Sequence, residues 1–504
     1  MSYLLSHTLS AGLIGIDAHL IDVELHISLG LPTWNTVGLP ESAVKESKDR
    51  VISAVHTCGY EFPYRRITIN LAPADIKKEG TAFDLPIAIG LLCAADLVPS
   101  EKLKDYLIVG ELSLTGKLRK IRGTLSIALL ARDLKLKGII IPAENYREAS
   151  VVEGIEIHGA KTLPEVVEFF ALEKEMPLPP QTHPPKKKSK TLDLSEVKGQ
   201  SYAKRALEIA AAGFHNLLLM GPPGTGKTML ASRLPTILPE MSFEESLTTT
   251  KIYSLMGLVR KDQSLVQERP FRSPHHTISD AGLIGGGSHP KPGEASLSHN
   301  GVLFLDELTE FRRNVLESLR QPLESGLVTI ARAQQSLTYP SQFLLAAAMN
   351  PCPCGHFGNP LGQCQCTPLQ LKKYQNKISG PLLDRIDLKV EVPAVKFEDL
   401  VDNKPEENSE SIRSRVCEAV DRQRKRLQPY ALQFNSQMGT QAIRDTCILD
   451  MTSQKILENA MNKFKLSARA FDRILRLART IADLKGSEQI ETNSLSEAIQ
   501  YRLG

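Results

Sequence analysis

The sequence lacks the features that mark membrane, secreted and strongly charged proteins. Its apolar stretches stay below the roughly 18–20 residues that a membrane helix needs. Residues 1–10 have neither the basic start nor the apolar core of a signal peptide. The formal net charge is only +4, so any nucleic-acid surface must come from local clustering of charge. We therefore expect a cytoplasmic protein that has no membrane partner.

Cysteine is scarce, with eight residues in 504, and a reducing cytoplasm argues against a disulfide framework. Four of the eight form two Cys-x-Cys pairs that are nine residues apart. Four thiolates on one loop can enclose Zn²⁺ tetrahedrally, and such a closed shell is structural rather than catalytic. The alternatives are four reduced cysteines without metal, or His356 in place of one sulfur. The candidate zinc ligands are Cys352, Cys354, Cys364 and Cys366.

A chain of 504 residues is too long for one ordinary hydrophobic core. Residues 173–190 are rich in proline and lysine and predict an extended linker. The lysine run 186–190 is either a solvated spacer or a contact with the DNA backbone. Residues 1–172 predict a compact α/β domain. Its strand-like runs are 67–71, 106–109 and 138–141, and its clearest helical pattern is 125–134.

After the linker, short apolar runs bounded by turn or polar residues read as buried parallel strands. These runs are 216–220, 301–305, 343–347 and 386–392. From about residue 395 onward the pattern is helical, with candidate helices at 411–427, 453–464, 468–484 and 494–503. The pattern predicts a nucleotide-binding core, residues 191–393, followed by a helical lid, residues 394–504.

Residues 221–228 fit the phosphate-binding loop pattern without a mismatch, between a predicted strand and a predicted helix. Glycines let such a loop wrap closely, so that backbone N–H groups face the phosphates. Lys227 is expected to reach the β- and γ-phosphates of ATP, and Thr228 to ligate Mg²⁺. The expected ATP-binding residues are Gly221, Pro222, Pro223, Gly224, Thr225, Gly226, Lys227 and Thr228.

Two acids and one amide follow later apolar strands. Asp306 and Glu307 lie at the carboxyl end of a predicted parallel strand, where open sheets bind ligands. We expect Asp306 to bind ATP through magnesium, and Glu307 to activate the attacking water as general base. Two acids after a strand can also start a helix, but the upstream loop favours catalysis. Asn350 ends the next strand and is expected to hold the attacking water or the γ-phosphate, a helix cap or turn being the alternative.

These elements, in this order and with a helical lid, resemble the AAA+ superfamily of ATPases. Leu-Leu-Asp-Arg-Ile-Asp around Arg385 resembles the arginine-finger segment of the magnesium-chelatase and replicative-helicase branch. The resemblance implies that Arg385 contacts the γ-phosphate bound by the neighbouring subunit; an intrachain pair with Asp384 or Asp387 is the alternative. Ser-Ala-Arg-Ala-Phe-Asp-Arg resembles the sensor 2 segment of that branch, which implies a role for Arg469, with Arg473 in reserve.

Residues 269–279, 285–287 and 290–297 form an insert with distinctive motifs. These are Arg-Pro-Phe-Arg-Ser-Pro-His-His-Thr-Ile-Ser, Gly-Gly-Gly and Pro-Lys-Pro-Gly-Glu-Ala-Ser-Leu. They closely resemble the bacterial magnesium-chelatase-like family of ComM and YifB proteins, and the resemblance covers nearly the whole chain. It implies a homohexameric ATPase that binds single-stranded and branched DNA and drives branch migration during natural transformation. Recombination proteins are then the expected further partners.

The glycines of this insert permit a mobile hairpin, which in a ring could project into the pore. Lys291, His275 and His276 are the candidate DNA contacts, to phosphate or to base. The adjacent histidines could instead hydrogen-bond a neighbouring loop. Metal ligation by the pair is disfavoured because adjacent side chains usually diverge.

Residues 78–84 and 110–116 resemble the segments of Lon proteases that carry the nucleophilic serine and lead to the catalytic lysine. Here the serine position is Ala82, and the stretch 121–127 has no lysine. Without a nucleophile and a base, the chain lacks the two groups that catalyse acyl transfer in such proteases. The resemblance therefore implies a proteolytically inactive Lon-like domain that serves DNA binding or assembly.

The sequence as a whole predicts a Lon-protease-like α/β domain, then an AAA+ parallel-sheet core with a helical C-terminal lid. The predicted function is a hexameric DNA motor, a helicase that uses ATP and Mg²⁺. Three other classes compete with it. Ala82 and the missing lysine disfavour an ATP-dependent protease, with a chaperone as its non-proteolytic variant, and the Lon-like domain disfavours a motor subunit of magnesium chelatase. The intact Lys227, Asp306 and Glu307 disfavour a DNA-binding scaffold with a vestigial ATPase.

Overall fold

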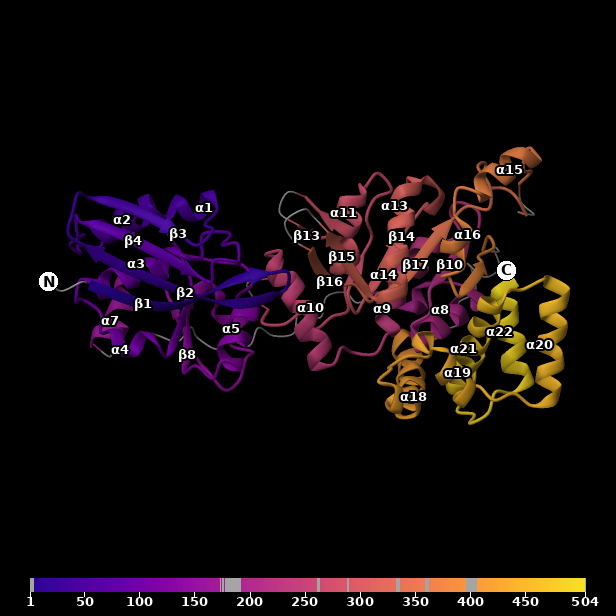
Figure 1. Ribbon diagram of the computed structural model, residues 1–504. Coiled ribbons are helices and arrows are strands. Elements are labelled where there is room, and N and C mark those ends of the chain that lie inside the picture. Colours follow the sequence, from indigo (N-terminus) through magenta and orange to yellow (C-terminus); the bar gives the residue numbers. More distant parts are fainter. Residues whose placement is uncertain are drawn as a thin grey trace. The chain divides into compact units, whose positions relative to one another are not determined.

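The computed structural model describes residues 4–172, 174, 176, 192–260, 263–287, 290–331, 336–358, 362–395 and 406–503. The chain forms two compact units (Figure 1). The first contains residues 1–187 together with 243–266, and the second contains 188–242 together with 267–504. Of the predicted linker, only residues 174 and 176 are among the described residues, so its lysine run lies outside them.

The first unit is built on a mixed seven-stranded sheet of order β3-β4-β2-β1-β5-β8-β9. Its strands are β1 (Leu4–Ile14), β2 (Asp17–Ser28), β3 (Thr33–Val37), β4 (Arg66–Ala72), β5 (Tyr106–Ile108), β8 (Gly138–Pro142) and β9 (Glu156–Ala160). β2 pairs antiparallel with β1 and β4, and the other neighbours pair in parallel. A short hairpin joins β6 (Glu111–Leu112) to β7 (Leu118–Arg119).

Helices cover both faces of this sheet. They are α1 (Ser42–Lys45), α2 (Ser47–Thr57), α3 (Asp84–Ala94), α4 (Ser100–Leu103), α5 (Thr124–Asp133), α6 (Tyr146–Ala149), α7 (Leu163–Leu172) and α10 (Phe243–Leu255). Because successive strand side chains point to opposite faces, Ile108 and Ile140 pack with α2, α3 and α7. Leu107 and Ile139 pack with α5 on the other face.

α10 and the residues after it belong to this first unit, although they lie inside the range expected for the nucleotide-binding core. Leu247 is buried in the same hydrophobic cluster as Leu107 and α5. The hydroxyl of Ser254 donates to the buried carboxylate of Glu148, and Lys251 lies 3.1 Å from Asp17. The chain therefore completes its first core with a segment that follows the phosphate-binding loop in sequence.

The second unit contains a five-stranded, wholly parallel sheet of order β11-β14-β17-β10-β18. Its strands are β10 (Leu217–Met220), β11 (Phe271–Arg272), β14 (Val302–Leu305), β17 (Leu344–Met349) and β18 (Leu388–Glu391). Two antiparallel hairpins lie outside the sheet, β12 (Gly285–Gly286) with β13 (Lys291–Pro292), and β15 (Leu327–Ala331) with β16 (Ser336–Pro340).

The helices around this sheet are α8 (Ser201–Gly213), α9 (Lys227–Ile237), α11 (Asp280–Ile284), α12 (Glu294–Leu297), α13 (Arg313–Ser318), α14 (Arg320–Ser325), α15 (Pro368–Gln375) and α16 (Gly380–Leu383). The C-terminal helices are α18 (Ser409–Leu427), α19 (Thr440–Thr446), α20 (Met451–Phe464), α21 (Ala468–Lys485) and α22 (Thr492–Leu503). Among the described helices, none is both long and apolar enough to cross a membrane.

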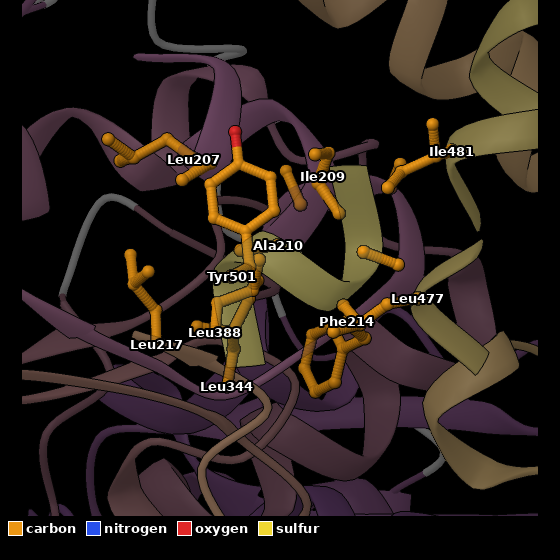
Figure 2. Packing of buried hydrophobic residues seen from close by; sticks show 14 of the residues in the cluster. Leu207, Ile209, Ala210, Phe214, Leu217, Leu344, Leu388, Leu477, Ile481 and Tyr501 are labelled. Atoms are coloured by element: carbon orange, nitrogen blue, oxygen red, sulfur yellow. The ribbon is translucent and has the colours of Figure 1, made fainter. Parts of the chain in front are cut away.

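One hydrophobic core joins the parallel sheet to the C-terminal helices (Figure 2). Leu217, Leu344 and Leu388 come from the sheet, whereas Leu477 and Tyr501 come from α21 and α22. Such a continuous core ties the helical region to the strands that carry the phosphate-binding loop. The predicted fold class is confirmed, including the parallel strands and the helical C-terminal region. The long antiparallel pair of β1 and β2 had not been predicted.

The packing of Leu247 yields a prediction about stability. Replacing this buried side chain by alanine in Leu247→Ala should lower the free energy of unfolding of the first unit by about 2–4 kcal/mol, because it leaves a cavity. The only tryptophan, Trp34, lies on β3 of that unit, so its fluorescence reports on the unit in a denaturant titration. Leu258→Ala is the matched control, since Leu258 is 46% exposed in the same segment. Equal midpoints for the two variants would contradict the assignment of this segment to the first core.

Candidate ATP site and cysteine cluster

The phosphate-binding loop joins β10 to α9, as its sequence predicted. Gly224 and Gly226 have φ angles of 77° and 84°, in the left-handed region that favours glycine. Gly221 is needed for a different reason: a Cβ atom there would lie 2.1 Å from the carbonyl oxygen of Val392 at the end of β18. The loop is therefore shaped by its glycines and held against the neighbouring strand.

Lys227 begins α9 and is buried against its own loop. Its ammonium donates to the carbonyl oxygens of Gly221 (2.7 Å) and Pro222 (2.8 Å), and to the side-chain oxygen of Asn350 (3.3 Å). Burial lowers the pKa of Lys227, and the charge of Asp306 opposes that shift. The lysine and Asn350 are thus brought together, although they are 123 positions apart in sequence.

Thr228 and Asp306 meet in the same place. The hydroxyl of Thr228 donates to a carboxylate oxygen of Asp306 at 2.6 Å. Asp306 follows β14 directly, and the carboxyl end of that strand lies at the same sheet edge as that of β10. Two adjacent oxygen donors, one of them a carboxylate, are the ligands that Mg²⁺ takes beside a bound nucleotide. The donor set therefore fits a magnesium ion.

Glu307, the predicted general base, has a partner that the sequence did not reveal. Its backbone is left-handed, with φ of 51°. A carboxylate oxygen of Glu307 lies 3.1 Å from Nδ1 of His276. The His275 ring lies 4.1 Å from the His276 ring, centre to centre, and its Nδ1 is 2.9 Å from the hydroxyl of Thr277. The histidine pair thus contacts Glu307 of the ATP site and Thr277 of its own loop.

These side chains line a cavity of about 330 Å³. Lys227, Asp306, Glu307 and Asn350 form one wall, and residues from α15 form another. The second wall was not predicted from the sequence. A signal for it was present in Gln370, Lys373 and Tyr374, whose spacing is that of one helix face.

The four cysteines of the loop that follows Asn350 converge. All four sulfur atoms lie within 4.8 Å of one another. Cys352 and Cys354 are 3.3 Å apart, and Cys364 lies 3.8 Å and 3.7 Å from them. Tetrahedral zinc with Zn–S bonds of about 2.3 Å would separate its sulfur ligands by roughly 3.8 Å. The cluster is therefore compatible with zinc.

The surroundings of the cluster favour the thiolate at Cys354, whereas desolvation and hydrogen bonds with neighbouring sulfurs raise the pKa of Cys364 and Cys366. Backbone N–H groups of His356 and Gln365 donate to the sulfur of Cys354 and lower the pKa of this thiol to about 6. The N–H of Phe357 donates to the sulfur of Cys352 at 3.3 Å. Because the thiolate is the form that binds metal, these donors prepare the loop for a cation. In metal sites, hydrogen bonds to the ligands usually orient them and tune their affinity for the metal.

Neither predicted arginine contact lies in the lining of the ATP cavity. Arg385 is buried, forms an ion pair with Glu324 and donates to the carbonyl oxygen of Pro381 at 2.6 Å. Arg469, the second residue of α21, is exposed, and Arg473 pairs with Asp387 at 3.0 Å. The roles of Arg385 and Arg469 stay predictions, and Glu324 is an intrachain partner that the sequence did not indicate.

Lys291 is exposed on β13, in the predicted hairpin of the insert. A second hairpin packs against it, since the hydroxyl of Tyr339 on β16 donates to the carbonyl oxygen of Pro290 at 2.8 Å. The loops at both hairpin ends lie outside the described residues. In the first unit, Ala82 packs on the cluster that contains Leu125, so apolar side chains occupy the stretches where Lon proteases carry their serine and lysine.

The comparisons with known proteins agree with this geometry. Residues 193–400 match the family model described as magnesium chelatase, subunit ChlI. Residues 23–145 and 406–502 match the models for subunit ChlI of Mg-chelatase and for its C-terminal region. The parallel sheet, the phosphate-binding loop and these matches define the class: a magnesium-chelatase-like AAA+ protein, which implies ATPase activity with ATP and Mg²⁺.

Full-length relatives define the family more closely. The competence protein ComM of Haemophilus influenzae is 46% identical over 97% of this chain and 96% of its own length. The protein YifB of Escherichia coli is 46% identical over 100% of this chain and 97% of its own length. The chain belongs to the ComM/YifB family. Lon protease 2 of Bacillus subtilis is similar over a shorter stretch, 30% identical over 25% of this chain and 23% of its own length.

The cysteine cluster predicts a measurable metal content. Protein purified without chelator should contain about one zinc per chain. The double substitution Cys352→Ser with Cys366→Ser should remove the zinc and lower the melting temperature by roughly 5 °C or more, because metal binding and folding are coupled. Cys417→Ser on α18, outside the cluster, is the control for loss of a partly buried cysteine. Metal-free protein of unchanged stability would refute the zinc site.

Proposed function

We propose that this protein is a ring-forming, ATP-driven DNA motor, a helicase that catalyses branch migration. Its role would be to promote integration of DNA during natural transformation and recombination. The convergence of Lys227, Asp306 and Asn350 on one cavity, with Thr228 hydrogen-bonded to Asp306, supports the ATPase part of the proposal. Similarity over nearly the whole chain to a protein named for competence supports the DNA part.

In the proposed reaction, Lys227 leaves the carbonyl oxygens of its loop and turns to the β- and γ-phosphates of ATP. Thr228 and Asp306 hold the magnesium ion that neutralises charge on these phosphates. Glu307 takes the proton of the attacking water, and Asn350 orients the water or the γ-phosphate. The present contacts of Lys227 and Thr228 are with groups that a nucleotide and its metal would replace.

Assembly into a homohexamer would complete the site. We propose that Arg385 reaches the γ-phosphate held by a neighbouring subunit once its pair with Glu324 opens, and that Arg469 contacts nucleotide from α21. Glu324 is well placed to release the arginine, because its side chain is 64% exposed and its competing solvation is strong. Nothing in this step requires a change of fold.

DNA contact is proposed for Lys291 at the hairpin of β12 and β13. A closed ring repeats each basic contact around one axis and so multiplies weak interactions. His275 and His276 lie at the base of the same insert, where His276 contacts Glu307 and could relay DNA engagement to the ATP site. A protease or chaperone, or a motor subunit of magnesium chelatase, is the competing function. The apolar positions Ala82 and Leu125 argue against the protease.

Two substitutions separate binding from hydrolysis. Lys227→Ala should abolish nucleotide binding, because the main cation of the loop is lost. Glu307→Gln should bind ATP with nearly normal affinity and hydrolyse it about 10²–10⁴-fold more slowly, because it lacks the general base. Equilibrium binding of ATP and steady-state phosphate release measure the two steps. Normal turnover by Glu307→Gln would overturn the assignment of the base.

The DNA proposal predicts that ATP tightens binding. Anisotropy of a labelled single strand should show weak binding without nucleotide and much tighter binding with Glu307→Gln protein that holds ATP. The affinity should fall steeply with salt, because several phosphates are neutralised together. Lys291→Ala should weaken this binding and reduce the DNA-stimulated increment in ATPase rate. Lys455→Ala, an exposed lysine on α20, is the matched control. Equal affinity with and without ATP would contradict the ring mechanism.

A further inference from the structure

A capping box fixes the first turn of α15, the helix that follows the cysteine cluster. Thr367, the residue after Cys366, caps α15: its hydroxyl accepts from the N–H of Gln370 at 3.3 Å. The side chain of Gln370 in turn accepts from the N–H of Thr367 at 2.9 Å. This reciprocal capping box fixes both the start and the direction of the helix. The position of the cysteine loop therefore determines where each residue of α15 lies.

The face of α15 that meets the ATP cavity follows from this start. Gln370, Lys373, Tyr374 and Lys377 all line the cavity. Gln370, Lys373 and Tyr374, at i, i+3 and i+4, lie on one face of α15, and Lys377 lies in the turn after its last residue, Gln375. Lys372 lies about 200° around the helix from Gln370 at 100° per residue, so it points away from the cavity. α15 thus presents Lys373 and Tyr374 to the site and the exposed Lys372 to solvent.

Tyr374 anchors this face to the two strands that carry the catalytic residues. Its hydroxyl accepts from the hydroxyl of Thr309, three residues after Asp306, at 2.7 Å. Burial raises the pKa of Tyr374, while hydrogen bonds with Thr309 and with the backbone of Asn350 oppose that rise. The tyrosine therefore ties α15 to the ends of β14 and β17 at once.

The cysteine loop is also packed on the phosphate-binding loop itself. Gly355, between Cys354 and His356, has φ of 80°, and a Cβ atom there would lie 2.7 Å from Cδ of Pro223. Pro353 lines the ATP cavity. The cluster thus contacts one side of the site through Gly355 and supplies the other side through α15.

The charges of the cavity show what this arrangement provides. Three carboxylates line it, Asp306, Glu307 and Glu310, and three lysines face them. Lys227 belongs to the phosphate-binding loop, and Lys377 lies 3.4 Å from Glu310 and over the Tyr374 ring. Within the described part of the chain, no acidic side chain forms an ion pair with Lys373. Besides Lys227, Lys373 is thus the described cavity lysine whose charge is available to a ligand.

We propose that Lys373 is a further phosphate-binding residue of the ATP site, which contacts the γ-phosphate, and that the four-cysteine loop is the device that holds it there. This inference rests on the proposed ATPase function, since it assumes that ATP fills the cavity. The terminal phosphate and the attacking water are expected beside Asp306, Glu307 and Asn350, and these residues line the same cavity as Lys373. Positive charge placed there stabilises both bound ATP and the charge that develops during hydrolysis.

The test is calorimetric binding of Mg²⁺ with either ADP or a non-hydrolysable ATP analogue. Lys373→Ala should weaken the ATP analogue roughly five- to tenfold, as expected for one charge-assisted contact at a partly exposed site. ADP affinity should change less than about twofold, because ADP lacks the phosphate that Lys373 contacts. Lys373→Arg should restore most of the loss, and Lys372→Ala on the opposite face should bind both nucleotides like the wild type.

A second variant tests the hydrogen bond that anchors α15 to Thr309. Tyr374→Phe removes the hydroxyl that accepts from Thr309 and keeps the ring, so the protein should fold. It should weaken the ATP analogue selectively, and the double variant with Lys373→Ala should lose little more than Lys373→Ala alone, because both changes act through one contact. Additive losses would show that the anchor does not act through Lys373.

The outcomes separate this inference from the proposed function. If the wild type binds neither nucleotide, or if Lys227→Ala binds both normally, the ATPase assignment fails. If these two proteins behave as expected while Lys373→Ala matches Lys372→Ala with both nucleotides, only the role of Lys373 is overturned. An equal loss of ADP and ATP-analogue affinity in Lys373→Ala would also overturn it, because the contact would then not involve the γ-phosphate.

Discussion

The carboxyl ends of β10, β14 and β17 meet at one edge of the parallel sheet, and their register determines where the ATP-site residues lie. Met220 pairs with Met349, and Leu305 pairs with Ala347. The residues that follow these strands are therefore brought within hydrogen-bond distance, although they are far apart in sequence. A shift of one residue in any of the three strands would turn the side chains at the strand ends to the other face. The hydrophobic core beneath the sheet opposes such a shift, since every strand residue of β14 and β17 is buried.

The same edge explains why a cysteine cluster can matter to nucleotide chemistry without touching nucleotide. The chain leaves β17 at Asn350, makes the four-cysteine loop, and returns over the cavity as α15. A loop of this length would ordinarily sample many conformations, and closing it costs entropy. A metal cross-link, a capping box and the Tyr374 hydroxyl each reduce that freedom. Structural zinc would then contribute to function by limiting where α15 can lie.

The first unit also depends on a segment that is distant in sequence. Of its two Lon-like segments, 78–84 leads into α3 and 110–116 contains β6, and Ala82 packs on the hydrophobic cluster that contains Leu125. Its core is completed by α10, a segment that departs after α9 and returns before β11. The ATP-site elements that flank this excursion, α9 with Lys227 and the insert with His276, are thus joined through the first unit along the covalent chain.

The sequence alone was sufficient to predict the elements whose signal lies within one short segment. The phosphate-binding loop is recognisable because its glycines and lysine must stand at fixed spacings, and apolar runs of four to six residues predict buried strands whatever lies around them. Four strands of the parallel sheet, the main C-terminal helices and the convergence of Lys227, Asp306 and Asn350 followed from these signals. The cysteine cluster could also be predicted from one short segment, because its four cysteines lie on one loop.

Contacts between distant segments were decided only by the tertiary structure. Arg385 pairs with Glu324 rather than with an acid beside it in sequence, and His276 contacts Glu307 across 31 positions. The pairing of β1 with β2 depends on their packing partners, and so does the placement of α10 in the first core. Hydrophobic periodicity within one segment does not identify those partners. The face of α15 had a helical spacing in the sequence, but only the folded chain showed that it meets the ATP cavity. Propensity and spacing describe a segment by itself, whereas pairing depends on which surfaces are buried together, and that is a property of the whole fold.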